Sequence, residues 1–422
     1  MQITATSQLD LAKYLRPGDR LVLGHACGEP TTLIEALIAQ ARDIAGLSIF
    51  IATSFSGQFT VDAADRFAIS SYGAIGALRT LAETHRISII PCHASQLSEL
   101  IESGIIGCDV AMVQISPAND SGEYSFGLVC DHMQAAIAKA RVVIAEINAQ
   151  VPFTYGDSLR ESQINCAIHV SRAPVEMASK KSGKTHEVIA RIAAGFVADG
   201  AVLQTGVGAL PDAILRQLLG HRDLGVHSGM LGEGFLELAQ AGVITNARKT
   251  IDTGLSVTCS LIGTNRLYAY AHRNIGLRVR SATYTHNSAV LARIEGLVTI
   301  NSAVEVDLTG QVNAEQNGIF YIGGTGGQVD FGRAGSCSPG GHSIIALPAT
   351  AKGGTVSRIT ACLSGPATTA RSDADIIVTE FGAAELKGQT LAERARRLVA
   401  IAHPHFQEGL DRTAHLIRKR GF

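Results

Sequence analysis

Short apolar runs that alternate with segments of helical periodicity constrain the fold of this chain most. Runs rich in β-branched residues each predict a buried strand; they include "RLVLGH", "VAMVQISP", "ARVVIAEI", "AVLQTGVG", "TIDTGLSV", "HSIIALP" and "DIIVTEFG". Between many of them lie segments with apolar residues at helical spacing, such as "EPTTLIEALIAQARDI", "DHMQAAIAKA", "LPDAILRQLL" and "LAERARRLVAIA". This alternation predicts an α/β fold with largely parallel sheets.

The length of the chain indicates two domains. A single hydrophobic core rarely extends over 422 residues. The segment "SRAPVEMASKKSGKTHEV", residues 171–188, interrupts the apolar pattern with small, polar and basic residues before a new series begins. We therefore predict an N-terminal α/β domain over 1–185 and a C-terminal α/β domain over 186–422.

The charge balance argues against several classes of partner. The net charge is −1, and no long run of Lys and Arg occurs, so we expect neither a nucleic-acid footprint nor binding to an anionic membrane surface. No stretch of about 18 apolar residues predicts a membrane span, and the first residues show no secretory or transit pattern. We expect a cytoplasmic protein.

The cysteines and histidines give no sign of a metal site. The eight cysteines are scattered without a CxxC pair, which is typical of buried thiols in a reducing compartment. The one close histidine pair, His403 and His405, is interrupted by Pro404 and has no cysteine or carboxylate cluster beside it in sequence. We therefore expect no bound metal.

Several motifs, taken together and in order, are similar to those of the acetyl-CoA hydrolase/transferase family, which includes 4-hydroxybutyrate and butyrate CoA-transferases. They are "GHACGEP" (24–30), "VQISPANDSGEYSFG" (113–127), "GVGALPDAIL" (206–215), "INSAVEVDLTGQV" (300–312), "GGTGGQVDF" (323–331), "ALPATAKGGTVSRI" (346–359), "VTEFG" (378–382) and "AHP" (402–404). The resemblance covers nearly the whole chain. It implies two tandem open α/β domains of the CoA-transferase fold with the active site between them. It also implies coenzyme A bound as the acyl-CoA substrate, a carboxylate acceptor and a homo-oligomer.

The "GGTGGQ" segment offers bare backbone amides that a phosphate or pyrophosphate can approach, with Lys352 as a candidate cation. From these residues alone, a glycine-rich β-turn is the alternative. The resemblance favours CoA binding, and the expected residues are Gly323, Gly324, Gly326, Gly327, Gln328 and Lys352.

In "GVGALPDAIL" two glycines follow a strand, and Pro211 stands where a helix would have its first turn. Free backbone amides are therefore expected at a helix N-terminus. In relatives this segment resembles a mobile loop beside the thioester, whose amides can stabilise an oxyanion. The resemblance gives this substrate-binding role to Gly206, Val207 and Gly208.

The motif that carries the nucleophile departs from the family pattern. CoA-transferases of this family read approximately His-Ser/Thr-Glu-Met, and the glutamate attacks the acyl-CoA to give a glutamyl-CoA thioester. This chain has His227, Ser228, Gly229 and Met230 at those positions. Glycine has no side chain for nucleophilic catalysis, so we do not expect the usual route and instead place Gly229 in the substrate pocket.

Three explanations compete for this departure. Glu233 could act from one helical turn further on, if a helix begins there. Water could be the nucleophile, with Glu29, Glu233, His227 or Asp307 as general base. The protein could also bind an acyl-CoA without turnover. By analogy only, heteromeric CoA-transferase-like proteins of steroid catabolism lack the glutamate and hydrolyse a carbon-carbon bond in a cyclic CoA thioester.

Other acidic residues have two readings. Glu305 and Asp307, in an alternating strand pattern that runs into a Thr-Gly turn, are either catalytic carboxylates or partners of neighbouring groups. Glu29 lies in a loop between a strand and a helix and precedes Pro30, an arrangement typical of either a functional loop or an ordinary helix start.

A second departure concerns the acyl pocket. Relatives carry an aromatic residue in a stretch that corresponds to "GAIGALR" (73–79), where this chain has Gly73 next to Tyr72. The absence of both a Phe-sized and a Glu-sized side chain predicts an enlarged pocket and a bulky acyl group. The sequence thus predicts an enzyme that processes a bulky acyl-CoA. The alternatives are a hydrolase of a CoA thioester and an acyl-CoA-binding protein without turnover.

Overall fold

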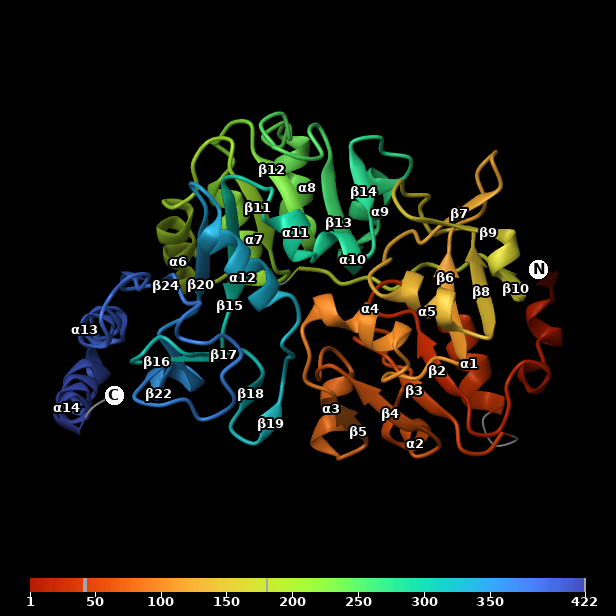
Figure 1. The fold of residues 1–422 in the computed structure, drawn as a ribbon, viewed down its shortest axis with the longest axis horizontal. Coiled ribbons are helices and arrows are strands. Elements are labelled where there is room, and N and C mark those ends of the chain that lie inside the picture. The colour runs from red at the N-terminus through yellow and green to blue at the C-terminus, as the bar shows by residue number, and fades with distance from the viewer. Residues whose placement is uncertain (41–43, 180, 421–422) are drawn as a thin grey trace. The chain divides into compact units, whose positions relative to one another are not determined.

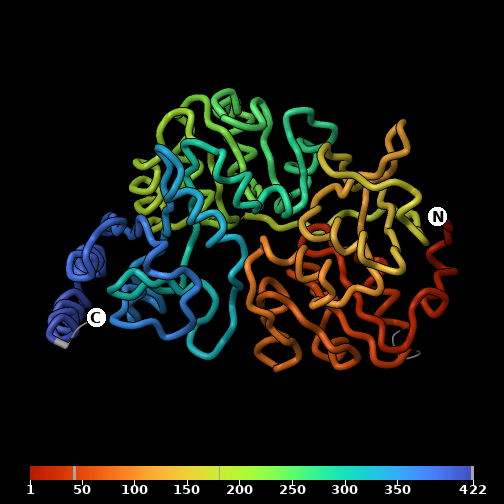
Figure 2. Tube along the Cα trace, viewed as in Figure 1, coloured from red at the N-terminus to blue at the C-terminus, as the bar shows by residue number. Residues whose placement is uncertain are grey.

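The computed structural model describes residues 1–40, 44–179 and 181–420, and its chain forms two compact units (Figures 1 and 2). Unit 1 comprises Met1–Ala178 and Ser256–Asn287, and unit 2 comprises Ser179–Leu255 and Ser288–Phe422. The first segment of unit 1 ends close to the boundary expected near residue 185. The segment 256–287, however, belongs to unit 1, so the units are not continuous in sequence.

Unit 1 contains an eight-stranded sheet in the order β1-β10-β8-β6-β2-β3-β4-β5, in which all neighbours are parallel. The strands are β1 (Gln2–Ile3), β2 (Arg20–Leu23), β3 (Ser48–Phe50), β4 (Ala68–Ser71), β5 (Ile87–Ile89), β6 (Val110–Ile115), β8 (Val142–Asn148) and β10 (Cys166–Val170). The chain proceeds outward from β2 to β5 and then returns to place β6 on the other side of β2. In such sheets, ligands bind at the carboxyl ends of the strands beside this reversal.

Helices and shorter strands complete unit 1. The helices are α1 (Thr31–Gln40), α2 (Val61–Ala64), α3 (Leu78–Glu83), α4 (Ala94–Glu102), α5 (Met133–Lys139), α9 (Asn265–Ala271) and α10 (Ala282–Thr285). The paired shorter strands are β7 (Glu123–Ser125) with β9 (Ser158–Arg160), and β13 (Ser256–Leu261) with β14 (Leu277–Val279). The helix expected from "EPTTLIEALIAQARDI" begins at Thr31, and its residues 41–43 lie outside the described residues.

In unit 2, six strands follow the order β12-β11-β15-β20-β24-β25, and only the last pair is antiparallel. They are β11 (Val202–Thr205), β12 (Gly225–Leu231), β15 (Leu297–Ser302), β20 (His342–Ala346), β24 (Ile376–Thr379) and β25 (Gly382–Glu385). The chain reverses beside β11, because β12 lies on one side of β11 and β15 on the other. The predicted α/β fold with largely parallel sheets is confirmed.

The helices of unit 2 cover both faces of its sheet. They are α6 (Lys184–Ala194), α7 (Ala209–Gln217), α8 (Glu233–Gln240), α11 (Ser288–Leu291), α12 (Gln328–Cys337), α13 (Leu391–Ile401) and α14 (Pro404–Arg420). Leu203 of β11 packs in one core with residues of α6, α7 and α8, whereas its neighbour Val202 packs in another with Phe331 of α12. Adjacent residues of β11 thus point to opposite faces.

Short strands lie beyond the edge of this sheet. β16 (Glu305–Asp307) lies between β17 (Val312–Asn313) and β23 (Ile359–Thr360). Two hairpins pair β18 (Gln316–Asn317) with β19 (Phe320–Tyr321), and β21 (Thr350–Ala351) with β22 (Val356–Ser357).

One predicted strand is wrong. The run "TIDTGLSV", residues 250–257, forms turns as far as residue 255, and β13 begins only at Ser256. Asp252 and Gly254 have φ angles of +52° and +77°, which no strand residue adopts. The amide of Gly254 donates to the carbonyl of Asn246, so this segment doubles back and does not extend.

A buried carboxylate anchors the first helix of unit 1. Glu146 of β8 is fully buried, and its Oε2 accepts hydrogen bonds from the backbone amides of Thr32 and Leu33, at 2.8 and 3.1 Å. These amides belong to the first turn of α1, which has no intrahelical acceptors for them. Burial raises the pKa of Glu146 to about 7, although the hydrogen bonds oppose the shift.

We predict that Glu146 makes the protein less stable as the pH rises from 4.5 to 7. In this window the folded state keeps a proton that the unfolded state has released, so the free energy of unfolding falls with pH and then levels off. Glu146→Gln cannot ionise, so its stability relative to the native protein should increase by about 3 kcal/mol across the window. Urea unfolding at pH 4.5 and pH 8 measures this difference. Glu99→Gln, at an exposed position, is the control, and parallel pH profiles for Glu146→Gln and the native protein would contradict the assignment.

Candidate active site

Parallel pairing in unit 2 brings two of the predicted site segments to the same level of the sheet. Val202 pairs with Gly225 and Leu203 with Val226, and the same register continued along both strands places Gly206 opposite Gly229. A hydrogen bond from Ser228 Oγ to the carbonyl of Thr205, at 3.2 Å, supports this continuation. The proposed nucleophile position and the first residue of the predicted thioester loop therefore lie side by side.

The loop 206–208 connects β11 to α7. Gly208 has a φ of +129°, a conformation that side chains rarely permit, and no atom lies within 4 Å of where a Cβ would be. The backbone conformation, and not lack of space, therefore requires glycine. α7 begins at Ala209, which puts Pro211 in the first helical turn as predicted. The first amides of α7 lack intrahelical acceptors and face the loop.

Residues of β12 alternate between the two faces of the sheet. Ser228 points into the core next to Leu215 of α7 and Phe235 of α8. His227 is fully buried on the other face, where its ring lies edge-on to Phe331 of α12, with the centroids 6.5 Å apart. Gly229 shares the face of His227. The residue at the nucleophile position thus lies on the side covered by α12.

Glu233 is the first residue of α8, so a helix does begin where the sequence suggested it. Its side chain is half-buried. An acidic residue in the first turn of a helix is stabilised by the free amides and the dipole there. Glu233 therefore lies one turn beyond Gly229, at the carboxyl end of β12.

The predicted CoA segment 323–328 precedes and opens α12. A Cβ on Gly323 would lie 2.6 Å from the carbonyl oxygen of Ala314, so packing requires glycine at this position. Gly326 has a φ of +54° and allows the turn before the helix. Gln328 begins α12 and donates from Nε2 to Thr369 Oγ1 at 3.0 Å. Part of the glycine pattern is therefore structural.

A cavity of about 240 Å³ lies beside these segments within unit 2. Its wall includes Ile322 and Ala351, which directly precede Gly323 and Lys352, whereas none of the predicted CoA-binding residues lines it. Arg358 also lines the cavity, and burial lowers the pKa of its guanidinium, opposed by the charge of Glu380. Sequence reasoning did not single out Arg358, although it lies inside the quoted motif "ALPATAKGGTVSRI".

The two acidic residues of β16 hold loops in place. Asp307 accepts hydrogen bonds from the backbone amide and side chain of Thr309 and of Gln311. Glu305 accepts from Asn313 Nδ2 and from the amide and hydroxyl of Ser364, all through Oε1. These contacts favour the structural reading of both carboxylates.

In unit 1, Glu29 lies in the loop after β2 and is fully buried. Its Oε1 accepts from the amides of Phe55 and Ser56, at 2.6 and 3.0 Å, and its Oε2 accepts from the hydroxyls of Ser54 and Ser56, at 3.0 and 2.6 Å. Burial raises the pKa of Glu29, and the four donors oppose that shift. The carboxylate is thus committed to the loop 54–56.

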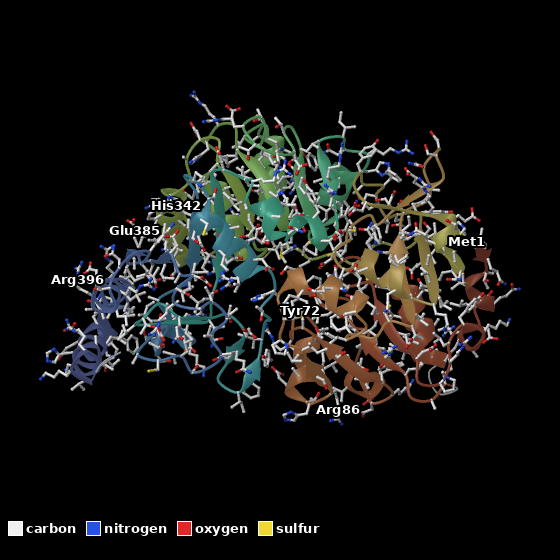
Figure 3. All side chains as sticks on the ribbon, in the orientation of Figure 1. Met1, Tyr72, Arg86, His342, Glu385 and Arg396 are labelled. Atoms are coloured by element: carbon white, nitrogen blue, oxygen red, sulfur yellow. The ribbon has the colours of Figure 1, made fainter. Side chains whose placement is uncertain are left out.

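The predicted acyl-pocket residues follow β4. Tyr72, labelled in Figure 3, is buried, and burial raises the pKa of its phenol well above the ordinary value. The amide of Gly73 donates to Ser71 Oγ at 3.3 Å, and Gly73 is also buried. Both residues lie at the carboxyl end of a strand, the edge of a parallel sheet where ligands bind.

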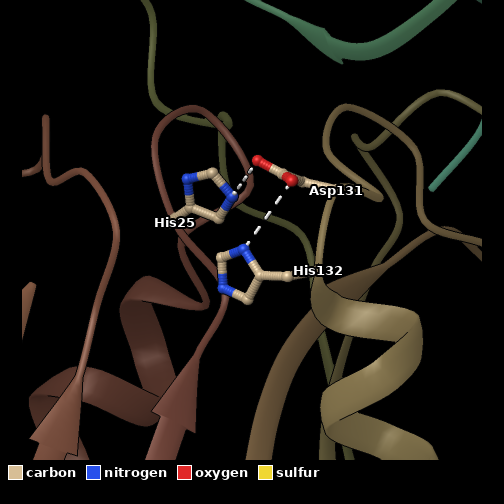
Figure 4. Close-up of side chains that lie close together, drawn as sticks. All are labelled: His25, Asp131 and His132. Carbon is tan, nitrogen blue, oxygen red and sulfur yellow. Dashed lines mark ion pairs between the residues drawn. The ribbon is translucent and has the colours of Figure 1, made fainter. Parts of the chain in front are cut away.

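The structure also brings together His25, Asp131 and His132, which sequence reasoning missed (Figure 4). His25 Nε2 lies 3.3 Å from Asp131 Oδ2, and His132 Nδ1 lies 3.8 Å from Asp131 Oδ1. Burial lowers the pKa of His25. Burial alone would raise the pKa of Asp131, but the two imidazoles hold it well below its ordinary value. No spacing rule could reveal the cluster, because His25 is far from the other two residues in sequence.

Within the described part of the chain, no helix combines the length and apolar character that crossing a membrane requires. Of the eight cysteines, six are buried as expected, whereas Cys337 and Cys362 are exposed.

Comparison with known proteins agrees with this arrangement. Family models for the N-terminal and C-terminal domains of acetyl-CoA hydrolase/transferase match residues 4–170 and 263–414. The chain is 40% identical over 396 residues to 4-hydroxybutyrate coenzyme A transferase of Clostridium kluyveri, covering 93% of this chain and 92% of that protein. It is 32% identical over 425 residues to succinyl-CoA:cyclohexane-1-carboxylate CoA transferase of Geobacter metallireducens, covering 98% and 95%.

A solved structure extends the likeness to the fold. The crystal structure of RipA from Yersinia pestis matches with a TM-score of 0.93 at 32% identity, over 99% of this chain and 98% of that one. The order of elements, the two parallel sheets and the sequence matches all lead to the same assignment, and the chain is an enzyme of the acetyl-CoA hydrolase/transferase family.

Proposed function

We propose that this protein processes the CoA thioester of a bulky acyl group by a route that does not use a glutamyl-CoA intermediate, with transfer of CoA to a carboxylate as its first activity. One observation carries the proposal. The register Val202–Gly225 and Leu203–Val226, continued along both strands, would bring Gly206 of the predicted thioester loop opposite Gly229. This supports the assignment, from the sequence resemblance, of a residue without a side chain to the place of the family nucleophile.

The binding roles follow from the elements around this point. The backbone amides of Gly206, Val207 and Gly208 would face the thioester carbonyl and stabilise an oxyanion. The segment 323–328 and Lys352 would bind CoA, and a cavity lined by Ile322 and Ala351, the residues that precede them, supports this assignment. Amides at the N-termini of α7 and α12 suit negatively charged groups of the ligand.

Glu233 is the better candidate for acid-base chemistry than Glu29. The Glu29 carboxylate accepts four hydrogen bonds from the loop 54–56, so its position is explained by its role in holding that loop. Glu233 instead lies half-buried one turn beyond Gly229. His227 is packed against Phe331, which supports a structural role for that histidine.

Two small residues would leave room for a bulky acyl group in the substrate pocket. The sequence resemblance implies larger side chains at the positions of Gly73 and Gly229, and Tyr72 would border the enlarged space. The relative from Geobacter metallireducens is named for a ring-containing acid, cyclohexane-1-carboxylate. This supports a ring or branched chain as the class of acyl group.

Hydrolysis is the second candidate, because the absent side chain at Gly229 leaves room for water as the attacking species and the family includes acetyl-CoA hydrolases. Binding without turnover is the third.

We predict that the purified protein transfers CoA from a bulky acyl-CoA to acetate. Mass spectrometry should follow free CoA, acetyl-CoA and rearranged acyl products with acyl-CoAs graded from butyryl-CoA to cyclohexane-1-carbonyl-CoA, each with and without acetate. Acetyl-CoA formed only with acetate supports transfer. Free CoA or a ring-opened product that forms equally with and without acetate supports hydrolysis and contradicts transfer. Unchanged acyl-CoA with a raised Tm identifies binding alone.

The same assay tests Glu233. Glu233→Gln should lower kcat by roughly a hundredfold or more if the carboxylate moves a proton. Glu237→Gln, one turn further along α8, is the matched control and should retain activity. Equal rates for both variants would exclude Glu233 as the acid-base group.

We predict that Gly229→Glu restores the usual covalent route. The new carboxylate would attack the thioester, and intact-protein mass spectrometry should find an adduct equal to the chain plus CoA minus water. Gly229→Gln has nearly the same size without the nucleophile and should give no adduct. An adduct of this kind on the native protein would mean that another carboxylate already serves as nucleophile.

We predict that Gly73→Phe narrows the acyl pocket. The ratio of kcat/KM for a ring acyl-CoA to that for butyryl-CoA should fall by roughly tenfold or more. Gly73→Ala should give a smaller change in the same direction. An unchanged ratio in both variants would remove Gly73 from the acyl pocket.

A further inference from the structure

The cluster of His25, Asp131 and His132 lies at the reversal point of the sheet in unit 1. His25 follows the end of β2, and Asp131 and His132 directly precede α5. β2 pairs with β6, so this is the carboxyl edge at which the chain direction across the sheet reverses. In Figure 4 both imidazoles are directed at the Asp131 carboxylate.

The three side chains are buried, and among the described residues five of their six side-chain nitrogen and oxygen atoms have no hydrogen-bond partner. The exposed fractions of His25, Asp131 and His132 are 4%, 8% and 0%. Neither ring nitrogen of either histidine has a hydrogen-bond partner, and Asp131 Oδ1 has none. Buried polar groups are otherwise nearly always paired, so these atoms indicate an absent binding partner.

The spacing of the atoms suits one metal ion. A ligand atom from each residue lies within 4.8 Å of the other two. Zinc binds nitrogen and oxygen at about 2.1 Å, which separates two ligands of a tetrahedral ion by roughly 3.4 Å. The 3.3 Å between His25 Nε2 and Asp131 Oδ2 meets this, whereas the 3.8 Å contact of His132 Nδ1 is with the other oxygen, Oδ1. Since the ligand atoms lie up to 4.8 Å apart, binding one ion requires the side chains to draw together by up to about 1.4 Å.

The backbone holds the two loops in unusual conformations. Ala26 and Asp131 have φ angles of +54° and +38°, which residues with a Cβ seldom adopt. The carbonyl of Asp131 accepts a hydrogen bond from the amide of Ala282, and Phe50 lies edge-on to the ring of His132. Such strain persists where the surrounding structure fixes it, often at binding sites.

We propose that His25, Asp131 and His132 form a binding site for one divalent transition-metal ion of the class that prefers imidazole, with Zn²⁺ as its representative. Two imidazoles and one carboxylate favour Zn²⁺ or Co²⁺ over Mg²⁺ and Ca²⁺, which prefer oxygen ligands. The ion would link the loop after β2 to the loop before α5. This proposal is independent of the acyl-CoA reaction. It differs from the expectation of no metal, which rested on ligands close together in sequence.

The test uses the whole protein stripped with a chelator and then desalted after exposure to Zn²⁺, Co²⁺ or Mg²⁺. Elemental analysis gives the metal content per chain, and thermal unfolding gives Tm. We expect about one Zn²⁺ or Co²⁺ per chain, a higher Tm with either ion and no effect of Mg²⁺. Asp131→Asn and His132→Asn should lower Zn²⁺ affinity at least tenfold.

The double variant His403→Asn and His405→Asn removes the only histidine pair close in sequence and is the control for adventitious binding. It should bind Zn²⁺ as the native protein does. Loss of the bound ion in this control, or a native chain that keeps no Zn²⁺ after desalting, would overturn the proposal. Where a variant of the cluster fails to fold, the visible absorption of Co²⁺ in the native protein decides. A tetrahedral nitrogen-oxygen spectrum supports the site, and the spectrum of the hydrated ion refutes it.

Discussion

The parallel register between β11 and β12 is the constraint on which the candidate site in unit 2 depends. It pairs Val202 with Gly225 and Leu203 with Val226, which, continued along both strands, would bring Gly206 opposite Gly229, and it turns Ser228 into the core beside α7 and α8. A slip of one residue would exchange the faces, so that Ser228 would face α12 and the glycine would leave a gap in the core. Because β15 pairs with β11 on its other side, Gly206 is fixed from both directions. The loop 206–208 therefore begins at a defined point, whatever conformation the loop itself adopts.

Hydrogen-bond partners separate the buried carboxylates into two groups. Glu29, Glu146 and Asp307 each accept bonds from backbone amides of a nearby loop or helix, and these contacts fix the paths of those segments. Asp131 instead has two imidazoles as its nearest polar side chains. A carboxylate committed to amides organises the fold, since removing it would leave those buried donors unsatisfied. A carboxylate that faces imidazoles can take part in proton transfer or in metal binding.

The sequence predicted strands and helix starts well where a segment is mostly apolar or where glycine and proline mark its end. The strands β6 and β8 are mostly apolar and buried along their whole length, and the start of α7 follows from two glycines and Pro211. The strand predicted over 250–257 was wrong because the apolar residues of this run lie in turns. A short apolar run in the sequence does not distinguish buried turns from a buried strand. The histidine cluster was missed because the fold, and not a motif, joins its members. Arg358 was missed because a single cation in the bend between β22 and β23 has no sequence signature until the cavity beside it is known.

Glycine occurs at two positions of β12, Gly225 and Gly229, for different physical reasons. At Gly225 a Cβ would lie 2.7 Å from Cγ of Lys249, whose ammonium donates to the carbonyls of Val226 and Leu255. The stem of this buried lysine fills the space of a side chain, and burial lowers the pKa of Lys249 to about 8. Packing thus accounts for Gly225. Gly229 lies at the carboxyl end of the strand, away from Lys249 and opposite the loop 206–208. Glycine in a strand often marks a place where a ligand or another backbone segment approaches closely, and the carboxyl edge of a parallel sheet is where ligands bind. A close approach of the acyl-CoA at Gly229 would agree with the substrate-binding role that we propose for this glycine.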